Sequence, residues 1–276
     1  MSDTEPLSDG RRKFVAGVAG AVAAAGLAGP RAAKAADEDK DQRKLGGVHA
    51  IPELAPQWKQ LDLAKILRYP AAYLSVSQNK SLYEPWGAQS AEKHWERGSL
   101  PATVKVVQAA RKAGNFKTFA WIGYEVFRES YPQSEFDRAQ YSTWIKGLEQ
   151  WPAEKKKKDN ELADELRALV KPGDLELNEQ ALQTAFVGTS LPLDLARKGI
   201  KTIVLTGIHL DWCIEGNARA ARDNGYLPIV IGDATACQHP EDEAAAFRRI
   251  NNFFAPVISA DTFVKLLGEG HEARGA

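Results

Sequence analysis

The sequence predicts a three-layer α/β/α Rossmann-like fold built on a six-stranded, mostly parallel sheet. From Tyr69 onward, short apolar runs alternate with helical patterns, and this alternation favours parallel strands covered by helices on both faces. The run 201–207, KTIVLTG, is apolar almost throughout, as is typical of a strand buried on both faces. A chain of 276 residues is long enough for one such domain with extensions.

The elements can be assigned in order along the chain. Strands are expected at 71–77, 117–124, 174–180, 201–207 and 226–236, with a brief sixth near 256–258. Helices are expected at 100–114, 161–174, 191–200, 213–225 and 241–253, with a terminal helix from Ser259. The aromatic-rich stretch 125–151 has no clean strand period, and the lysines 155–158 are expected on a solvated turn or helix face.

The first 35 residues have the order of an export signal. Arg11-Arg12-Lys13-Phe14 precedes an apolar run at 15–29 and Ala33-Lys34-Ala35, a pattern typical of twin-arginine signals. The run is shorter than the ~20 residues of a bilayer span, so no stable membrane insertion is expected after cleavage. We therefore predict a signal peptide at 1–35, an N-terminal leader and extension at 36–68, an α/β domain at 69–270, and a periplasmic location.

Charge and cysteine content exclude several classes of partner. Lysine and arginine together number 36, as do aspartate and glutamate, so no net field attracts nucleic acid. A small-molecule substrate is the expected partner. Two cysteines, Cys213 and Cys237, are too few for a disulfide framework, although an oxidising compartment permits one bridge between them.

Cys213 follows the strongest predicted strand and begins a predicted helix. Ligands of open parallel sheets bind beyond the carboxyl ends of the strands, which is where Cys213 is expected. Backbone N–H groups at a helix N-terminus favour thiolate and can also stabilise an oxyanion. From its spacing alone, Cys213 is equally well explained as a small buried hydrophobic residue.

The region around Cys213 resembles the isochorismatase-like cysteine hydrolase superfamily. The matching residues, in order, are Ala185-Phe186, Gly188-Thr189, Gly207, Cys213-Ile214-Glu215, Ala218-Arg219 with Ala221, Gly225-Tyr226 and Asp233-Ala234. A weaker resemblance covers Gln78-Asn79 and Leu100-Pro101. The resemblance implies a cysteine hydrolase with Cys213 as nucleophile, which cleaves an amide, an imide or, in one branch, a vinyl ether.

The resemblance also implies finer features of the site. These are a non-proline cis peptide at His209–Leu210, the Leu210 and Cys213 amides as oxyanion donors, and a homo-oligomer. No cofactor is expected. The five histidines (49, 94, 209, 239 and 271) do not form the Asp-x-His pair of nicotinamidase-like members, so no metal is predicted.

Two positions depart from the Asp, Lys and Cys triad that the family uses. Aligning Gln78-Asn79 with the family pattern puts Val76 at the aspartate position, between Ser75 and Ser77. At the lysine position stands Glu179, which is either a substitute base or an ordinary loop carboxylate. His209, four residues before the thiol, could also approach it.

A possible pocket is expected around Ser77, Gln78, Trp86, Trp121 and Tyr124, although core packing can explain each aromatic residue alone. The sequence thus predicts an exported cysteine hydrolase of a small amide-like (C–N) or related acyl substrate. The alternative is a catalytically inactive or redox-sensitive periplasmic binding protein with the same fold. A Cys213–Cys237 disulfide would favour that alternative, because it would block the nucleophile.

Overall fold

A computed structural model of the chain describes residues 50–124, 134–145, 147–180 and 183–272. The side chains of residues 124, 149, 178–180 and 269–272 also lie outside the described part. All described residues belong to one compact unit, 39–276. The predicted signal peptide and the leader up to residue 49 lie outside the described residues, so their boundaries stay predictions. Within the described ranges, no helix combines the length and the apolar character that a bilayer crossing requires.

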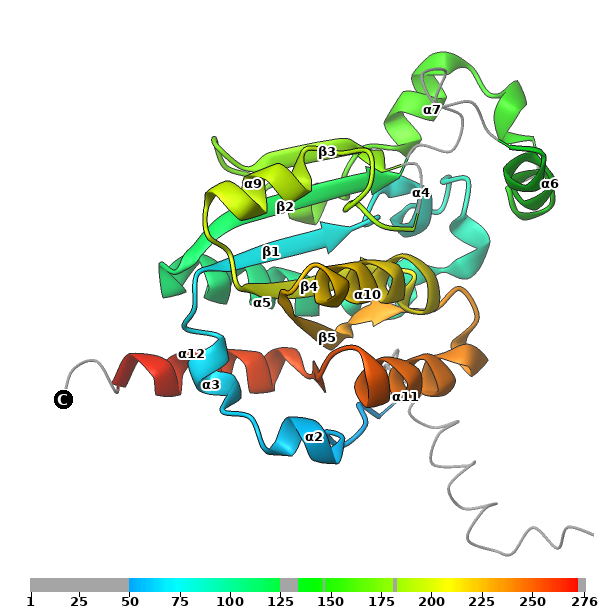
Figure 1. Cartoon of the computed structure of the whole chain (residues 1–276). Helices are drawn as coiled ribbons and strands as arrows, with labels where there is room; N and C mark the ends of the chain where they lie inside the picture. The colour runs from blue at the N-terminus through cyan, green and yellow to red at the C-terminus, as the bar shows by residue number, and fades with distance from the viewer. Residues whose placement is uncertain (1–49, 125–133, 146, 181–182, 273–276) are drawn as a thin grey trace, which may run out of the picture. The chain divides into compact units, whose positions relative to one another are not determined.

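The predicted sheet of six strands is confirmed, and all of its pairings are parallel (Figure 1). The order across the sheet is β3-β2-β1-β4-β5-β6. The strands are β1 (Ala71–Val76), β2 (Phe116–Tyr124), β3 (Leu175–Gln180), β4 (Thr202–Ile208), β5 (Leu227–Ala236) and β6 (Val257–Ile258). Every residue of the two central strands, β1 and β4, is buried, which accounts for their nearly continuous apolar sequences.

Helices cover both faces of the sheet. Successive residues of each strand point to opposite sides, so neighbouring side chains pack against different sets of helices. Tyr73 of β1 packs on one side against α3 (Leu63–Ile66), α5 (Ser99–Ala113), α8 (Asp164–Arg167) and α12 (Ala260–Glu272). Its neighbour Leu74 packs on the other side with α9 (Leu191–Arg197), α10 (Glu215–Asp223) and α11 (Glu243–Phe253). The three-layer prediction is therefore confirmed.

The remaining helices are short and lie in the connections between the main elements. They are α2 (Pro56–Lys59), α4 (Lys80–Tyr83), α6 (Glu135–Trp144) and α7 (Ala153–Asp159), with single 3₁₀ turns η1 (Ser90–Glu92), η2 (His94–Glu96), η3 (Leu148–Gln150) and η5 (Pro240–Asp242). The predicted lysine face at 155–158 lies on α7. Figure 1 shows α4, α6 and α7 beyond the arrowheads of β1 and β2.

The predicted helix at 161–174 is wrong, because only the single turn α8 forms there. The chain before this turn pairs with the segment that follows β1. Lys80 N donates to Glu161 O at 2.8 Å, and Ala163 N donates to Gln78 O at 3.0 Å. These backbone groups are thereby unavailable to a helix, and Pro172 disfavours helical geometry just before it.

The sheet changes direction between β1 and β4. The chain runs from β1 outward through β2 and β3, and then returns to the other side of β1 as β4. Such a switch point opens a crevice at the carboxyl ends of the two strands. Close approach of the strands there depends on Gly207, whose φ is 127° and whose added Cβ would lie 2.0 Å from Val76 O. The residues after Val76 and Ile208 are therefore the ones placed at the crevice.

Candidate active site

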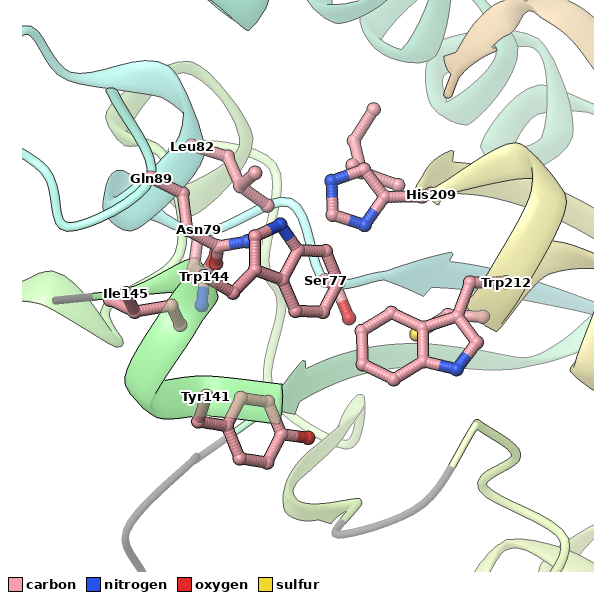
Figure 2. A pocket seen from close by; sticks show the side chains of 11 residues that line it. Ser77, Asn79, Leu82, Gln89, Tyr141, Trp144, Ile145, His209 and Trp212 are labelled. Carbon is pink, nitrogen blue, oxygen red and sulfur yellow. The ribbon is translucent and has the colours of Figure 1, made fainter. Parts of the chain in front are cut away.

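A pocket that opens to solvent lies at this switch point (Figure 2), with about 330 Å³ of space between the atoms when the adjoining open solvent is included. The connections after β1 and β4 meet helix α6 around it. Its lining residues are Ser77, Asn79, Leu82, Gln89, Tyr141, Trp144, Ile145, Ile208, His209, Trp212 and Cys213. The structure thus brings Ser77, His209 and Cys213 of the predicted site together.

Cys213 lies in a π-helical turn, η4 (Leu210–Ile214), between β4 and α10. The predicted helix start at residue 213 is therefore two residues too early for α10. His209 O accepts from Ile214 N at 2.9 Å, and the side chain of Asn217 donates to Cys213 O at 2.8 Å. These bonds fix the turn, and the thiol residue is only 2% exposed.

The cis peptide bond is present, but it joins Ile208 to His209. The predicted bond, His209–Leu210, is wrong by one residue, because the strand continues through Ile208 and the change of direction begins directly after it. Leu210 is fully buried at the start of η4. His209, at the turn between strand and helix, is 4% exposed and lines the pocket.

The residues after β1 divide between the core and the pocket. Val76 is completely buried in the core on the α9–α11 side of the sheet and carries no group that could accept a proton. Gln78 also faces the interior, where its Oε1 accepts from Ser75 Oγ at 2.8 Å and its Nε2 donates to Thr103 at 2.9 Å. Of the predicted pocket residues in this segment, Ser77 lines the pocket and Gln78 does not.

Three buried polar atoms of pocket-lining residues have no hydrogen-bond partner among the described residues. They are Ser77 Oγ, Asn79 Oδ1 and Trp144 Nε1. Ser77 also has a left-handed backbone, with φ of 52°, which is uncommon for a residue other than glycine. Unpaired buried polar groups cost stability, and they are the groups that a bound ligand can satisfy.

Aromatic rings form much of the pocket wall. Trp144 lies 4.7 Å from Trp212, 5.6 Å from His209 and 6.3 Å from Tyr141 between ring centroids. In Figure 2 the side chains of Ser77, Trp144, His209 and Trp212 surround the same hollow. Two rings of this wall come from α6, in the stretch where sequence reasoning found no pattern. The capping box formed by Ser134 and Asp137 was the available signal for that helix.

The aromatic residues predicted for the pocket lie elsewhere. Trp121 is 2% exposed in the core, and its Nε1 donates to Asp174 at 2.9 Å. Trp86 is half-buried outside the pocket wall, with the Lys158 ammonium 4.8 Å from its ring centroid. Tyr124 ends β2, and its side chain lies outside the described residues.

A carboxylate–histidine group, which sequence reasoning missed, lies behind the pocket wall. Glu92 Oε2 contacts His209 Nε2 at 2.6 Å and His94 Nε2 at 2.7 Å. Arg97 Nη1 lies 3.4 Å from His94 Nδ1 and also donates to Cys237 O at 2.5 Å. Because arginine can only donate, His94 Nδ1 accepts, and its Nε2–H donates to Glu92.

Burial and hydrogen bonding set the charges of this group. Burial alone would raise the pKa of Glu92, but the hydrogen bonds from His209 and His94 outweigh it and lower this pKa to about 2. Burial lowers the pKa of His94 to about 4, against the opposing hydrogen bond to Glu92. At neutral pH the group therefore contains an ionised Glu92 and a neutral His94.

Within the described residues, Glu92, His94 and His209 also form the one set whose metal-binding atoms lie within 4.8 Å of one another. Their present spacing is that of hydrogen bonds. One carboxylate oxygen contacts both rings at 2.6 and 2.7 Å, whereas two ligand atoms of a tetrahedral zinc ion are separated by about 3.3 Å. In this structure the three side chains are therefore a hydrogen-bonded group.

The other groups singled out near the thiol have different environments. Glu179 lies in β3, and its side chain is outside the described residues, so its role stays a prediction. Glu215 forms ion pairs with Arg219 and Arg249 and does not line the pocket. No disulfide joins Cys213 to Cys237, and burial raises the pKa of Cys237.

Comparison with known proteins agrees with this architecture. The sequence model of the Isochorismatase domain matches residues 77–262. The chain belongs to the isochorismatase family. Ureidoacrylate amidohydrolase RutB of Stutzerimonas stutzeri is 35% identical over 106 residues, which are 38% of this chain and 42% of that protein. The RutB protein of Methylobacterium radiotolerans is 34% identical over 98 residues, or 35% of this chain and 38% of its own length. The chain thus spans less than half the length of these relatives.

Solved structures of isochorismatase-like proteins share the fold. A cysteine hydrolase from Pseudomonas syringae pv. phaseolicola superposes with a TM-score of 0.57 at 17% identity, over 74% of this chain and 94% of that chain. Nicotinamidase PncA from Bacillus subtilis gives 0.54 at 19%, over 69% and 99% of the two chains. N-carbamoylsarcosine amidase from Thermoplasma acidophilum gives 0.52 at 23%, over 69% and 96%. At these identities the likeness supports the fold and not the substrate.

Proposed function

We propose that this isochorismatase-family protein is an exported cysteine hydrolase that cleaves the C–N bond of a small amide-like substrate through a covalent adduct on Cys213. The observation that carries the proposal is the position of Cys213 in the wall of a small pocket at the switch point of the sheet. Membership of a hydrolase family supports it. So do the names of the two partial relatives, which are amidohydrolases.

The proposed reaction has two stages. The Cys213 sulfur attacks the carbonyl carbon, and the nitrogen departs to leave a thioester, which water then hydrolyses. The Leu210 and Cys213 amides are the proposed donors to the oxyanion. The unpaired Ser77 hydroxyl is a further donor available in the pocket.

The pocket favours a small, flat substrate. Trp144, Trp212 and Tyr141 offer ring surfaces, against which a planar conjugated amide can stack. Asn79 and Ser77 supply polar atoms at the same surface. A ureido or carboxamide group combines both requirements, since it is planar and also donates and accepts hydrogen bonds.

One observation favours the alternative of a non-hydrolytic binding protein. The position of the family aspartate is occupied by Val76, which is buried in the core and cannot accept the thiol proton. The sequence predicts Glu179 as a substitute base, and this role stays a prediction. The redox-sensitive form of this alternative requires a Cys213–Cys237 bridge, and no disulfide joins these residues in this structure.

Turnover of a panel of amides tests the proposal. Purified protein would be incubated with ureidoacrylate, an N-carbamoyl amino acid and nicotinamide, and ammonia release would be measured. We expect release from at least one substrate and its loss in Cys213→Ala. Cys237→Ala is the matched control, because Cys237 is a buried free cysteine outside the pocket wall. Equal activity of Cys213→Ala and wild type would contradict the proposal.

Export and assembly are proposed on the sequence alone. Replacing Arg11 and Arg12 with lysines should retain the protein in the cytoplasmic fraction, because twin-arginine signals depend on the paired arginines. An unchanged periplasmic yield would argue against this route. Family resemblance favours a homo-oligomer, which light scattering of the purified protein would reveal.

A further inference from the structure

The loss of the family carboxylate leaves the thiol without its usual proton acceptor. Val76 is apolar, and its flanking hydroxyls, Ser75 and Ser77, accept protons poorly at neutral pH. A cysteine nucleophile still requires a group that takes the thiol proton or stabilises the thiolate. Such a group must line the same pocket as Cys213.

His209 meets this requirement by position. It lies at the other end of the π-helical turn that carries Cys213, and both residues line the pocket. The turn is closed by Ile214 N, which donates to His209 O, so the two side chains are positioned by one backbone unit. The His209 ring is 4% exposed and packs against the Trp144 and Trp212 rings, at centroid distances of 5.6 and 6.4 Å.

The hydrogen bond to Glu92 defines which nitrogen of His209 can act. Glu92 Oε2 lies 2.6 Å from His209 Nε2, so the ionised carboxylate holds the proton on that nitrogen. In the neutral ring the lone pair is then on Nδ1. The described residues contribute no hydrogen bond to that Nδ1. Carboxylate–imidazole pairs of this kind activate hydroxyl and thiol nucleophiles on unrelated folds.

We propose that His209 is the catalytic base for Cys213 and that Glu92 is the positioning residue that orients and polarises it. The inference rests on the proposed cysteine hydrolysis and names the group that replaces the missing aspartate. Glu92 comes from the 3₁₀ turn η1, 117 residues before His209, so the pair is assembled by the fold.

In each of the two proposed stages, His209 accepts one proton and then returns it. The Sγ–H proton moves to His209 Nδ1 as sulfur bonds to the acyl carbon and the carbonyl electron pair moves to oxygen. When the tetrahedral species collapses, the C–N bond breaks and His209 returns that proton to the departing nitrogen. Water then attacks the thioester carbon and His209 takes one water proton. As the C–S bond breaks, His209 passes that proton to the Cys213 sulfur, which regenerates the thiol and releases the acid.

Other charged or titratable groups surround this path. Those near His209 and Cys213 are Glu92 and His94 on the η1–η2 segment, Arg97 behind His94, and Tyr141 on α6. Asp211, in the π-helical turn, interacts with Cys237. The pKa of the Tyr141 hydroxyl is raised mainly by burial and to a smaller extent by the nearby Cys213. This hydroxyl therefore stays protonated near neutral pH. The charged group in contact with His209 is Glu92.

Alkylation of Cys213 by iodoacetamide tests the inference without requiring turnover. The rate would be measured from pH 5 to 10 for wild type, His209→Gln, Glu92→Gln and Glu179→Gln. The matched control is Glu96→Gln, which removes an exposed acid from the same segment. A circular dichroism spectrum and an unfolding midpoint for each variant would establish that it is folded.

We expect wild type to react near neutral pH. His209→Gln should react only as pH approaches about 8.5, the value of a free cysteine. Glu92→Gln should slow alkylation about tenfold at pH 7 and shift its pH profile upward, whereas a merely structural role would change the rate without moving the profile. Glu96→Gln should match wild type.

Two results would overturn the inference. One is a folded His209→Gln whose pH profile superimposes on that of wild type, above all if Glu179→Gln shifts instead. The other is loss of neutral-pH reactivity in wild type on EDTA treatment with recovery on adding zinc, which would make the three side chains a metal site. Failure of the proposed function looks different: the His209-dependent profile would be present, but no amide would be cleaved.

Discussion

Replacing His94 with glutamine should remove a defined part of the acid sensitivity of folding. His94 has no exposed side-chain surface and donates to Glu92. A glutamine amide can keep a donor toward Glu92 and an acceptor toward Arg97, but it never takes up a proton. The variant therefore preserves the hydrogen-bond types while removing one titration from the interior.

The expected magnitude follows from the pKa of His94. Burial lowers that pKa from 6.5 to about 4 in the folded protein. Between these values the unfolded chain binds more protons than the folded one, so the free energy of unfolding falls as pH drops from 6.5 toward 4. From pH 7.5 to 4.5 this amounts to about 2 kcal/mol. The contribution of Glu92, whose pKa is lowered to about 2, is lost mainly below this window.

Urea unfolding followed by tryptophan fluorescence at pH 7.5, 5.5 and 4.5 gives the required free energies. The loss of stability between pH 7.5 and 4.5 should be about 2 kcal/mol smaller in His94→Gln than in wild type. His239→Gln, which removes an exposed imidazole, controls for the loss of one histidine. Parallel pH dependences of wild type and His94→Gln would refute the assignment of a buried, neutral His94.

Two further substitutions test the framework of the site. Gly207→Ala should destabilise the protein by about 4 kcal/mol or more, because the new Cβ would lie 2.0 Å from Val76 O. A melting temperature equal to that of wild type would contradict this expectation. Glu215→Gln weakens the pairs with Arg219 and Arg249, whose side chains are 47% and 40% exposed. We expect the free energy of unfolding in urea to fall by about 1–2 kcal/mol and the Cys213 alkylation rate to be retained. A large fall in the alkylation rate would instead place Glu215 in the site.

The sheet could be predicted from sequence because its signal is local. The central strands β1 and β4 are buried along their whole length, and continuous apolar runs between turn residues reveal such strands directly. The helix predicted at 161–174 failed for a non-local reason. Glu161 and Ala163 use their backbone groups to bind residues 78–80, about eighty residues away in the chain, and helical periodicity cannot report such a competition.

The site was predictable only where a motif or strand end marked it. Cys213 and Ser77 follow strands, so the topology of a parallel sheet brings them together. The Glu92–His209 contact joins residues 117 positions apart, and nothing in the spacing of either residue indicates it. Glu92 and His94 have an acid-x-His spacing, which was the available signal, but the glutamate departs from the Asp-x-His pair of nicotinamidase-like members.

The most direct test of the central claim is to trap the covalent intermediate. The protein would be mixed with a cleaved amide, quenched in acid within milliseconds to seconds, and digested for peptide mass spectrometry. We predict that the peptide containing Cys213 gains the mass of the acyl group, that the adduct disappears as substrate is exhausted, and that Cys213→Ala shows none. Amide cleavage with an unmodified Cys213 at every time point, or an acyl group on another residue, would contradict the account.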